Sequence, residues 1–175
     1  MAEICQKSQV AGGLMKRLFF ILFFWAALFL VSCQDEYGIL EYQERDIVAV
    51  CQVNEKYTVE IAKTAELRTI TVKEPKSMAG LSFEIGETVW AVAGNTRIQM
   101  DRESLGGICA LADIFCQSEE CLTTATGEGN STTLTFQNES CTYKITMGKN
   151  SLPQRVYIVS DSFEYNVEIV SIELK

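Results

Sequence analysis

Large apolar residues alternate with polar ones along most of the chain from residue 47 onward. In residues 57–62, for example, every second residue is Tyr, Val or Ile. Successive strand side chains point to opposite faces, so a period of two predicts strands with one buried face. Turns are expected at 54–55, 86–87 and 94–95, where Asn or Gly tolerates positive φ. The pattern predicts six antiparallel strands in chain order, whose apolar residues include Ile70, Val72, Leu81, Phe83, Ile85, Trp90, Val92, Ile98 and Met100.

The period changes at residues 104–115, where apolar residues recur every three or four positions. This spacing places them on one face of an amphipathic helix. Ser104 is the predicted N-cap. Gly106 and Gly107 each lower helix propensity by about 1 kcal/mol relative to alanine, so we expect a late helix start or a close approach to the sheet. The apolar face consists of Leu105, Ile108, Ala112 and Phe115.

Strand-like alternation resumes after the helix. The predicted strands are 122–125, 132–137, 141–147, 154–159 and 163–174. In the last of them the large residues occupy odd positions up to 169 and even positions from 170, and this phase slip predicts a bulge or a sharp bend. A sheet of about ten strands in one domain does not lie flat. The predicted fold is therefore mainly β: a strongly curved antiparallel sheet or incomplete barrel that wraps one central amphipathic helix.

Residues 15–36 form a separate, strongly apolar unit. Lys16 and Arg17 precede fourteen uninterrupted apolar residues, 18–31. As a helix this run extends roughly 21 Å, whereas a bilayer core of roughly 30 Å requires about 20 residues. A positively charged start and a short apolar core that ends in a small residue are typical of a cleaved export signal. We therefore expect a helical signal peptide here, and not a membrane span.

This unit resembles the signal peptide of bacterial lipoproteins. In that family a short motif precedes a cysteine that is lipidated and becomes the mature N-terminus; here the motif is Leu30, Val31 and Ser32, and the cysteine is Cys33. The resemblance implies cleavage before Cys33, a lipid such as palmitate attached to it, and a place on the extracytoplasmic face of the cell membrane. Gln34 stands where an aspartate would indicate retention at the inner membrane. In a host with two membranes the outer membrane or the cell surface is therefore expected.

The chain divides into four expected segments. Residues 1–14 are an upstream extension, because Met15 is a suitable start for the signal. The signal peptide is 15–32, a polar tether follows at 33–46, and one β-rich domain of ordinary size occupies 47–175.

The lipid signal, the antiparallel strands, the central helix and the closing segment 152–158 together resemble the lipoprotein-localisation fold. The chain is also similar to small lipoproteins of Gram-positive anaerobes. In the lipoprotein-localisation family an incomplete barrel wraps over helices and leaves an apolar cavity for acyl chains or other hydrophobic ligands. The carriers of that family have a longer N-terminal helix than this chain. The candidate cavity residues are Phe83, Trp90, Phe115, Phe136, Tyr143 and Ile145, and the alternative is that they pack the helix onto the sheet.

The composition excludes several kinds of chemistry. The sequence contains no histidine, which removes imidazole-based triads and histidine metal ligands. A formal net charge of −8 disfavours a nucleic-acid partner. The densest acidic groups, 101–103 and 119–120, flank the predicted helix, where acids near the start have a structural explanation. We expect no catalytic, cofactor or metal site.

Five cysteines lie in the predicted domain: Cys51, Cys109, Cys116, Cys121 and Cys141. None of them forms a C-x-x-C pair, which argues against a structural zinc site. Export permits disulfides, and Cys116 with Cys121 is one candidate pair, although the odd number leaves at least one thiol free. The other interpretation is that the cysteines are small apolar core residues.

These observations predict a lipid-anchored, non-enzymatic envelope protein whose curved sheet binds or shields a hydrophobic ligand such as a lipid. The alternative is an interaction or structural module that contacts another envelope protein. A carboxylate-based hydrolase is the third hypothesis, and it requires two acids facing one cleft.

Overall fold

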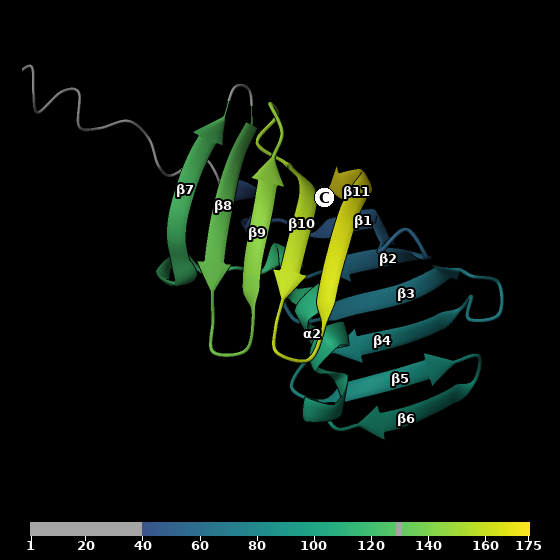
Figure 1. The fold of residues 1–175 in the computed structure, drawn as a ribbon. Coiled ribbons are helices and arrows are strands. Elements are labelled where there is room, and N and C mark those ends of the chain that lie inside the picture. The colour runs from purple at the N-terminus through teal and green to yellow at the C-terminus, as the bar shows by residue number, and fades with distance from the viewer. Residues whose placement is uncertain (1–39, 129–130) are drawn as a thin grey trace, which may run out of the picture. The chain divides into compact units, whose positions relative to one another are not determined.

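The structure is a computed structural model that describes residues 40–128 and 131–175. Within these residues one antiparallel sheet of eleven strands curves around a short helix, α2 (Gly106–Ala112) (Figure 1). The mainly β class, the open curved sheet and the central helix are as the sequence predicts. The proposed export signal, with Leu30, Val31 and Ser32, and the lipidation residue Cys33 lie outside the described residues.

The first half of the sheet is a six-strand meander, which we call the N-terminal arm. Each strand pairs with the one before it, as predicted. Asn54 and Glu55 have φ values of 50° and 57°, and Gly94 has a φ of 57°, so two of the expected turns need the left-handed backbone. The strands are β1 (Ile47–Val53), β2 (Tyr57–Lys63), β3 (Arg68–Glu74), β4 (Leu81–Ile85), β5 (Val89–Ala93) and β6 (Thr96–Met100).

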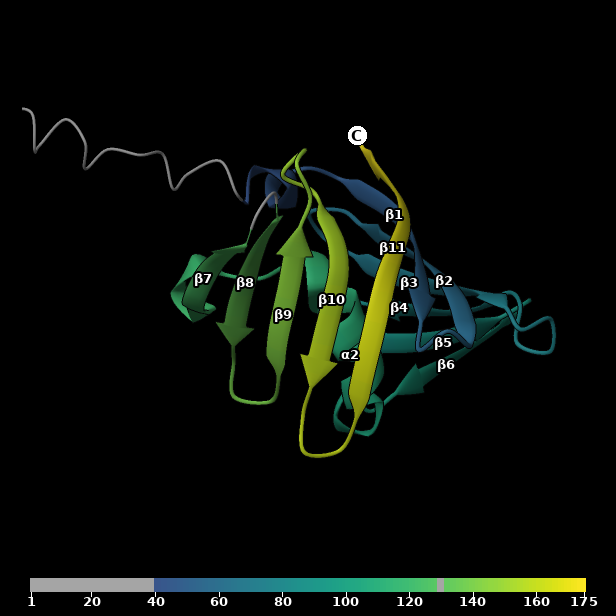
Figure 2. The ribbon, with the colours of Figure 1, turned by 45° about the horizontal axis from the view of Figure 1, so that its top comes forward.

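The second half is a five-strand meander, the C-terminal arm. Its last strand pairs with β1, so the first and last strands meet in the middle of the sheet while β6 and β7 form its edges. In Figures 1 and 2 the strands of this arm run steeply and β3–β6 run nearly crosswise. The strands are β7 (Leu122–Glu128), β8 (Ser131–Gln137), β9 (Thr142–Met147), β10 (Pro153–Val159) and β11 (Glu164–Leu174).

The connection between the two edges explains where the helix lies. After β6 the chain has to cross from one edge of the sheet to the other, and it does so as η3 (Glu103–Leu105), α2 (Gly106–Ala112) and η4 (Asp113–Phe115). A further 3-10 turn, η5 (Glu119–Cys121), leads into β7. The crossing segment buries its apolar side in the same core as the concave face of the sheet. The helix therefore fills the curve that the two arms create.

The start of the helix differs from the expected cap and agrees with the expected close approach to the sheet. The prediction that Ser104 is the N-cap is wrong: Ser104 lies inside η3, and its backbone amide and hydroxyl donate to the carboxylate of Asp101 at 3.3 and 3.1 Å. A Cβ on Gly107 would lie 2.5 Å from the hydroxyl oxygen of Tyr165 on β11. The close approach of helix and sheet at the glycine pair is thus confirmed.

The phase slip in the last strand is a β-bulge. Val50 pairs with Ser171 and Cys51 pairs with Ile169, which leaves Val170 without a partner on β1. Val170 is 64% exposed, so it belongs to the outer surface and not to the buried face. The bulge is confirmed, and the apolar face resumes at Ile172.

Candidate ligand-binding cleft

A cleft of about 760 Å³ opens between the start of the helix and two loops of the C-terminal arm. The loops join β8 to β9 and β10 to β11. We call this the concave cleft; it has a floor and a rim. Its lining includes Cys109, Ala110, Cys141, Tyr143 and Phe163 on the floor and Arg102, Asn138, Ser140, Ser160 and Ser162 on the rim.

The floor consists of side chains that point inward because of their spacing along the helix and along β9. Cys109 and Ala110 follow Gly106 by three and four residues and therefore share its face of the helix. Cys141 and Tyr143 are two residues apart at the start of β9 and share its buried face. Burial raises the pKa values of the two thiols and of the Tyr143 hydroxyl. These groups are therefore uncharged near neutral pH, and the charge beside them in the lining is the Asp113 carboxylate, which is paired with Arg68.

The rim loops are held by their own side chains. Asn138 Oδ1 accepts a hydrogen bond from the backbone amide of Cys141 at 2.8 Å. Ser160 Oγ accepts one from the backbone amide of Phe163 at 3.3 Å. Such side-chain-to-backbone bonds fix a turn locally. The rim of the cleft is therefore preformed.

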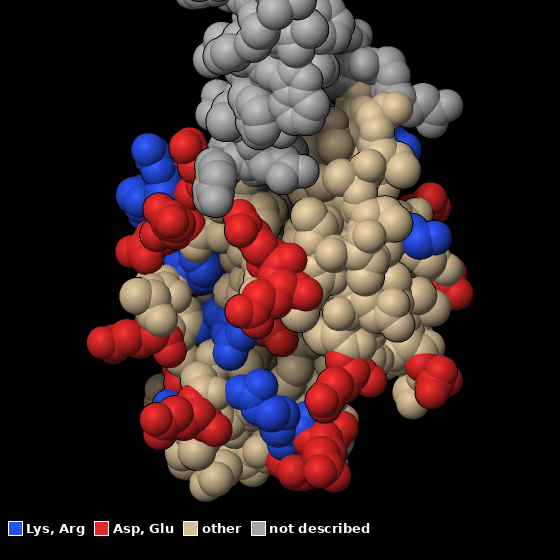
Figure 3. Space-filling view, turned by 90° about the vertical axis from the view of Figure 1, so that its left-hand side faces the viewer, with Lys and Arg blue, Asp and Glu red and all other residues tan. Residues whose placement is uncertain are grey.

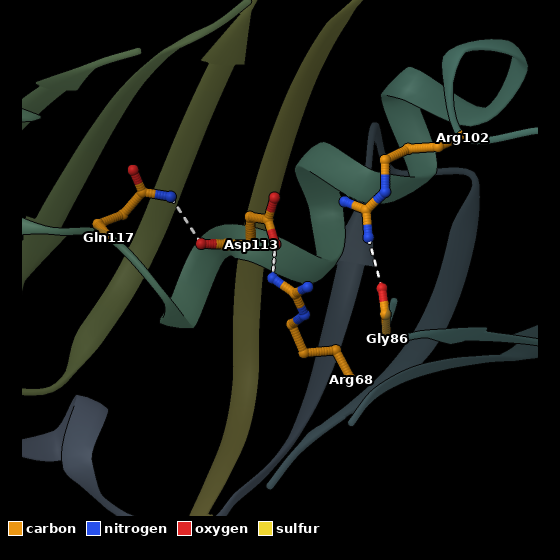
Figure 4. Close-up of polar contacts among 5 residues, drawn as sticks. All are labelled: Arg68, Gly86, Arg102, Asp113 and Gln117. Carbon is orange, nitrogen blue, oxygen red and sulfur yellow. Dashed lines mark hydrogen bonds and ion pairs between the residues drawn. The ribbon is translucent and has the colours of Figure 1, made fainter. Parts of the chain in front are cut away.

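Two arginines tie the helix to the N-terminal arm (Figure 4). Arg102 donates to the carbonyl oxygen of Gly86 at 2.6 Å, and Arg68 forms an ion pair with Asp113 at the other end of the helix. Gln117 donates to the backbone carbonyl of Asp113 at 2.6 Å. Burial raises the pKa of the Asp113 carboxyl, and the two guanidinium groups oppose this shift. The acid nearest the helix end thus has a structural role.

The structure separates the six predicted cavity residues. Tyr143, Phe115, Phe136 and Ile145 are all fully buried in the common core, and of these four only Tyr143 also borders the concave cleft. The last three pack the helix and the C-terminal arm together, which was the alternative interpretation.

Phe83 and Trp90 lie on opposite faces of the N-terminal arm. Val89 is the inward residue of β5, so its neighbour Trp90 faces outward, where the Arg97 guanidinium lies 4.3 Å from its ring centroid. The expectation that Trp90 lines the concave face is corrected, because a shift of one residue in the assumed alternation moves a side chain to the other face. Phe83 faces inward, opposite Ala91.

A second apolar surface lies on the concave face of the N-terminal arm toward the β6 edge. Phe83 pairs with Ala91, which pairs with Ile98, and Leu81 pairs with Ala93, so these five side chains share one face. Exposure increases toward the edge, where Ile98 is 56% exposed. This surface is apolar but open, in contrast to the concave cleft.

All five cysteines of the described region are free thiols. Cys51, Cys109 and Cys141 are buried, and Cys116 and Cys121 are half-buried. The candidate pair Cys116–Cys121 is not joined. Within residues 40–128 and 131–175 no group of three or more metal-ligating side chains comes together, and no helix has the length and hydropathy needed to span a membrane.

Comparison with known proteins places the fold but not the family. No protein-family model matches the sequence, and no curated protein does so either. An uncharacterized conserved protein from Thermus thermophilus matches 82% of this chain over 88% of its own length, with 16% identity and a TM-score of 0.53. A LolA superfamily protein from Nitrosomonas europaea matches 79% of this chain over 92% of its own, with 11% identity and a TM-score of 0.43. The first likeness shows a shared fold, and the second is too distant to carry an argument.

The sequence predicts the helix and the strands that border the concave cleft, but it does not predict that they enclose a cleft. The sequence predicts residues 138–140 and 160–162 only as connections between strands. The Asn and Ser residues that stabilise these turns were the available signal. Their approach to Cys109 on the helix depends on pairings that are distant in sequence.

Proposed function

We propose that this chain is a lipid-anchored, non-enzymatic protein of the bacterial envelope that binds a hydrophobic or amphiphilic ligand, such as a lipid, in the concave cleft. The observation that carries the proposal is the cleft itself, with its uncharged floor, its polar rim and a volume of about 760 Å³. Ligand sites commonly have volumes of about 300–1,000 Å³, with mostly apolar walls and a few fixed polar groups.

The division between floor and rim defines the chemistry of the ligand. The apolar part would lie against the half-buried ring of Phe163, above Cys109 and Ala110, where it gains about 25 cal/mol for each Å² of apolar surface removed from water. A polar group would reach Arg102 and the Ser160 loop at the rim. An amphiphile with a narrow apolar portion fits this arrangement better than a purely polar metabolite.

The anchor belongs to the same proposal. Acylation of Cys33 would hold the domain at the membrane, because each buried CH₂ contributes about 0.8 kcal/mol and two or more chains give stable attachment. The acidic sequence, with its net charge of −8, is repelled by an anionic membrane surface. The domain would then work in the aqueous layer beside the membrane.

Binding without catalysis is supported by the chemistry of the cleft. The chain has no histidine, and the carboxyl of Asp113, whose pKa is raised by burial, is engaged by Arg68. The remaining acids at the cleft, Glu103, Glu139 and Asp161, are exposed on its rim. Exposed carboxylates on the rim are solvated by water, and this environment does not favour general acid–base catalysis.

The test is to fill the cleft without disturbing the fold. In Gly106→Leu the new side chain extends beside Phe163, and its Cβ would meet only the Phe163 ring, at 3.8 Å. Leucine also favours the helix over glycine by about 0.8 kcal/mol. The full chain is purified from bacterial membranes in mild detergent and examined by native mass spectrometry, which also reports the mass added at Cys33.

We expect wild type and the control Ala65→Leu, in the exposed turn after β2, to carry a bound amphiphile that Gly106→Leu loses. A wild-type protein that carries no such molecule, or equal binding by Gly106→Leu, would reject the cleft as the ligand site. An unmodified Cys33 would reject the anchor.

A further inference from the structure

One edge of the sheet has little of the usual protection. β7 is the last strand in the sheet order, with β8 as its one neighbour among the described strands. Residues 122–127 contain neither a charge nor a proline, and all six are exposed. Natural edge strands are commonly guarded by charged residues, proline or bulges. The bulge in the pairing with β8 lies at the start of β7, between Leu122 and Thr124, and the pairing from residue 124 to 128 is regular.

The opposite edge is different. β6 carries Arg97, which forms an ion pair with Glu84 at 2.6 Å and lies over the ring of Trp90. A strand that added to β6 would have to accommodate this charged cluster. β7 therefore offers an open template for strand pairing over residues 122–127, because its one charged residue, Glu128, is the last of the strand, whereas Arg97 lies within β6.

The side of the molecule on which β7 lies has an uneven charge distribution (Figure 3). A broad area without charged side chains adjoins a zone in which acidic and basic side chains gather. Because the chain carries a net charge of −8, two copies repel each other over most approaches. Residues 122–127, between Glu120 and Glu128, carry no charge, and they are the part of this edge where two copies can meet with least repulsion.

We propose that β7 pairs antiparallel with β7 of a second copy of this chain, about a two-fold axis that passes beside Ala125. Ala125 pairs with Leu134 on β8, and Thr124 and Thr126 pair with Thr135 and Thr133. Alternation therefore places Ala125 on one face and both threonines on the other. Residues opposite each other in an antiparallel pair share a face, so a centre at Ala125 is compatible with the pleat.

This register makes the contact self-complementary. Ala125 faces Ala125 of the second copy, and Thr124 faces Thr126 of the second copy twice, once on each side of the axis. Threonine pairs across strands stabilise a sheet. The bulge after Leu122 confines the regular overlap about residue 125 to residues 124–126 of the two copies. A two-fold contact of this kind closes on itself, so it predicts a dimer and no longer polymer.

The test uses charge placement to read the register. In Thr124→Lys/Thr126→Lys, both pairs of residues 124 and 126 across the axis become Lys opposite Lys. In Thr124→Glu/Thr126→Lys, every such pair becomes Glu opposite Lys. Both variants alter the same two exposed positions, so the second is a matched control for folding and solubility of the first.

Full-length proteins are purified from membranes and their oligomeric state is measured by light scattering in detergent over a range of concentrations. We expect wild type to dimerise, the Lys/Lys variant to show a dissociation constant raised about tenfold, and the Glu/Lys variant to regain dimerisation. Oxidative cross-linking of Ala125→Cys in intact cells should give a dimer, while Ala65→Cys should not.

Each other result overturns the proposal. A monomeric wild type at high concentration rejects the contact, and equal dimerisation of the two charge variants places the contact elsewhere. Higher oligomers reject the closed two-fold arrangement. A cross-link from residue 125 to a different envelope protein means that β7 receives another partner's strand.

Discussion

Phe115 provides a direct test of whether the interior is a packed core or a ligand cavity. It ends the helical segment, has no exposed surface, and meets the ring of Tyr42 edge-on, with centroids 6.4 Å apart and planes at 89°. Tyr42 lies in η2 (Glu41–Glu44), within the predicted tether. Phe115 therefore joins the helix, the sheet and the segment that enters the domain.

The expected cost of Phe115→Ala follows from these contacts. Removing a fully buried phenylalanine loses about 2–3 kcal/mol of transfer free energy. The edge-to-face contact with Tyr42 contributes about 1 kcal/mol beyond that. With the cavity left behind, we expect the free energy of unfolding to fall by about 3–5 kcal/mol. That is a large fraction of the roughly 5–15 kcal/mol that stabilises a typical domain.

The assay is equilibrium urea unfolding followed by far-ultraviolet circular dichroism, with Val170→Ala as the control. Val170 is 64% exposed on the bulge, so its truncation should change stability by less than about 0.5 kcal/mol. The urea midpoint of Phe115→Ala should be lower than that of wild type, while the slope of the unfolding free energy against urea concentration should stay the same. A loss below about 1 kcal/mol in ligand-free protein would show that Phe115 lines a space and not a packed core.

Two further predictions concern the centre of the sheet and the helix. Burial raises the pKa of the Cys51 thiol to about 12, so the folded state favours the neutral thiol. This contribution to the free energy of unfolding should be complete below a pH of about 8.5. At higher pH the free energy of unfolding should fall by up to about 1.4 kcal/mol per pH unit. Between a pH of about 7.5 and a pH of about 10.5, the urea midpoint should fall less steeply with pH for Cys51→Val than for wild type. Equal slopes for the two proteins would contradict this. Gly107→Ala should destabilise by about 1–2 kcal/mol although alanine favours helices, because its Cβ meets the Tyr165 hydroxyl at 2.5 Å. Thermal unfolding of the double variant with Tyr165→Phe should recover part of the loss, and no recovery would place the strain elsewhere.

The local elements of this protein could be derived from sequence because their causes are local. A period of two in side-chain polarity predicted the strands, the change to helical spacing predicted residues 104–115, and Asn54 and Gly94 marked turns that need positive φ. Even the bulge at Val170 was visible as a slip in the alternation. Each of these features depends on a few neighbouring residues and on backbone geometry.

The tertiary structure decided which strands meet and which faces are covered. The pairing of β1 with β11 joins the two ends of the domain, and it makes β7 an edge. The tertiary structure also determines that Trp90 faces outward and that the loops at Asn138 and Ser160 approach Cys109. An alternating pattern has two faces of similar local preference, and contacts between residues far apart in sequence determine which face is buried.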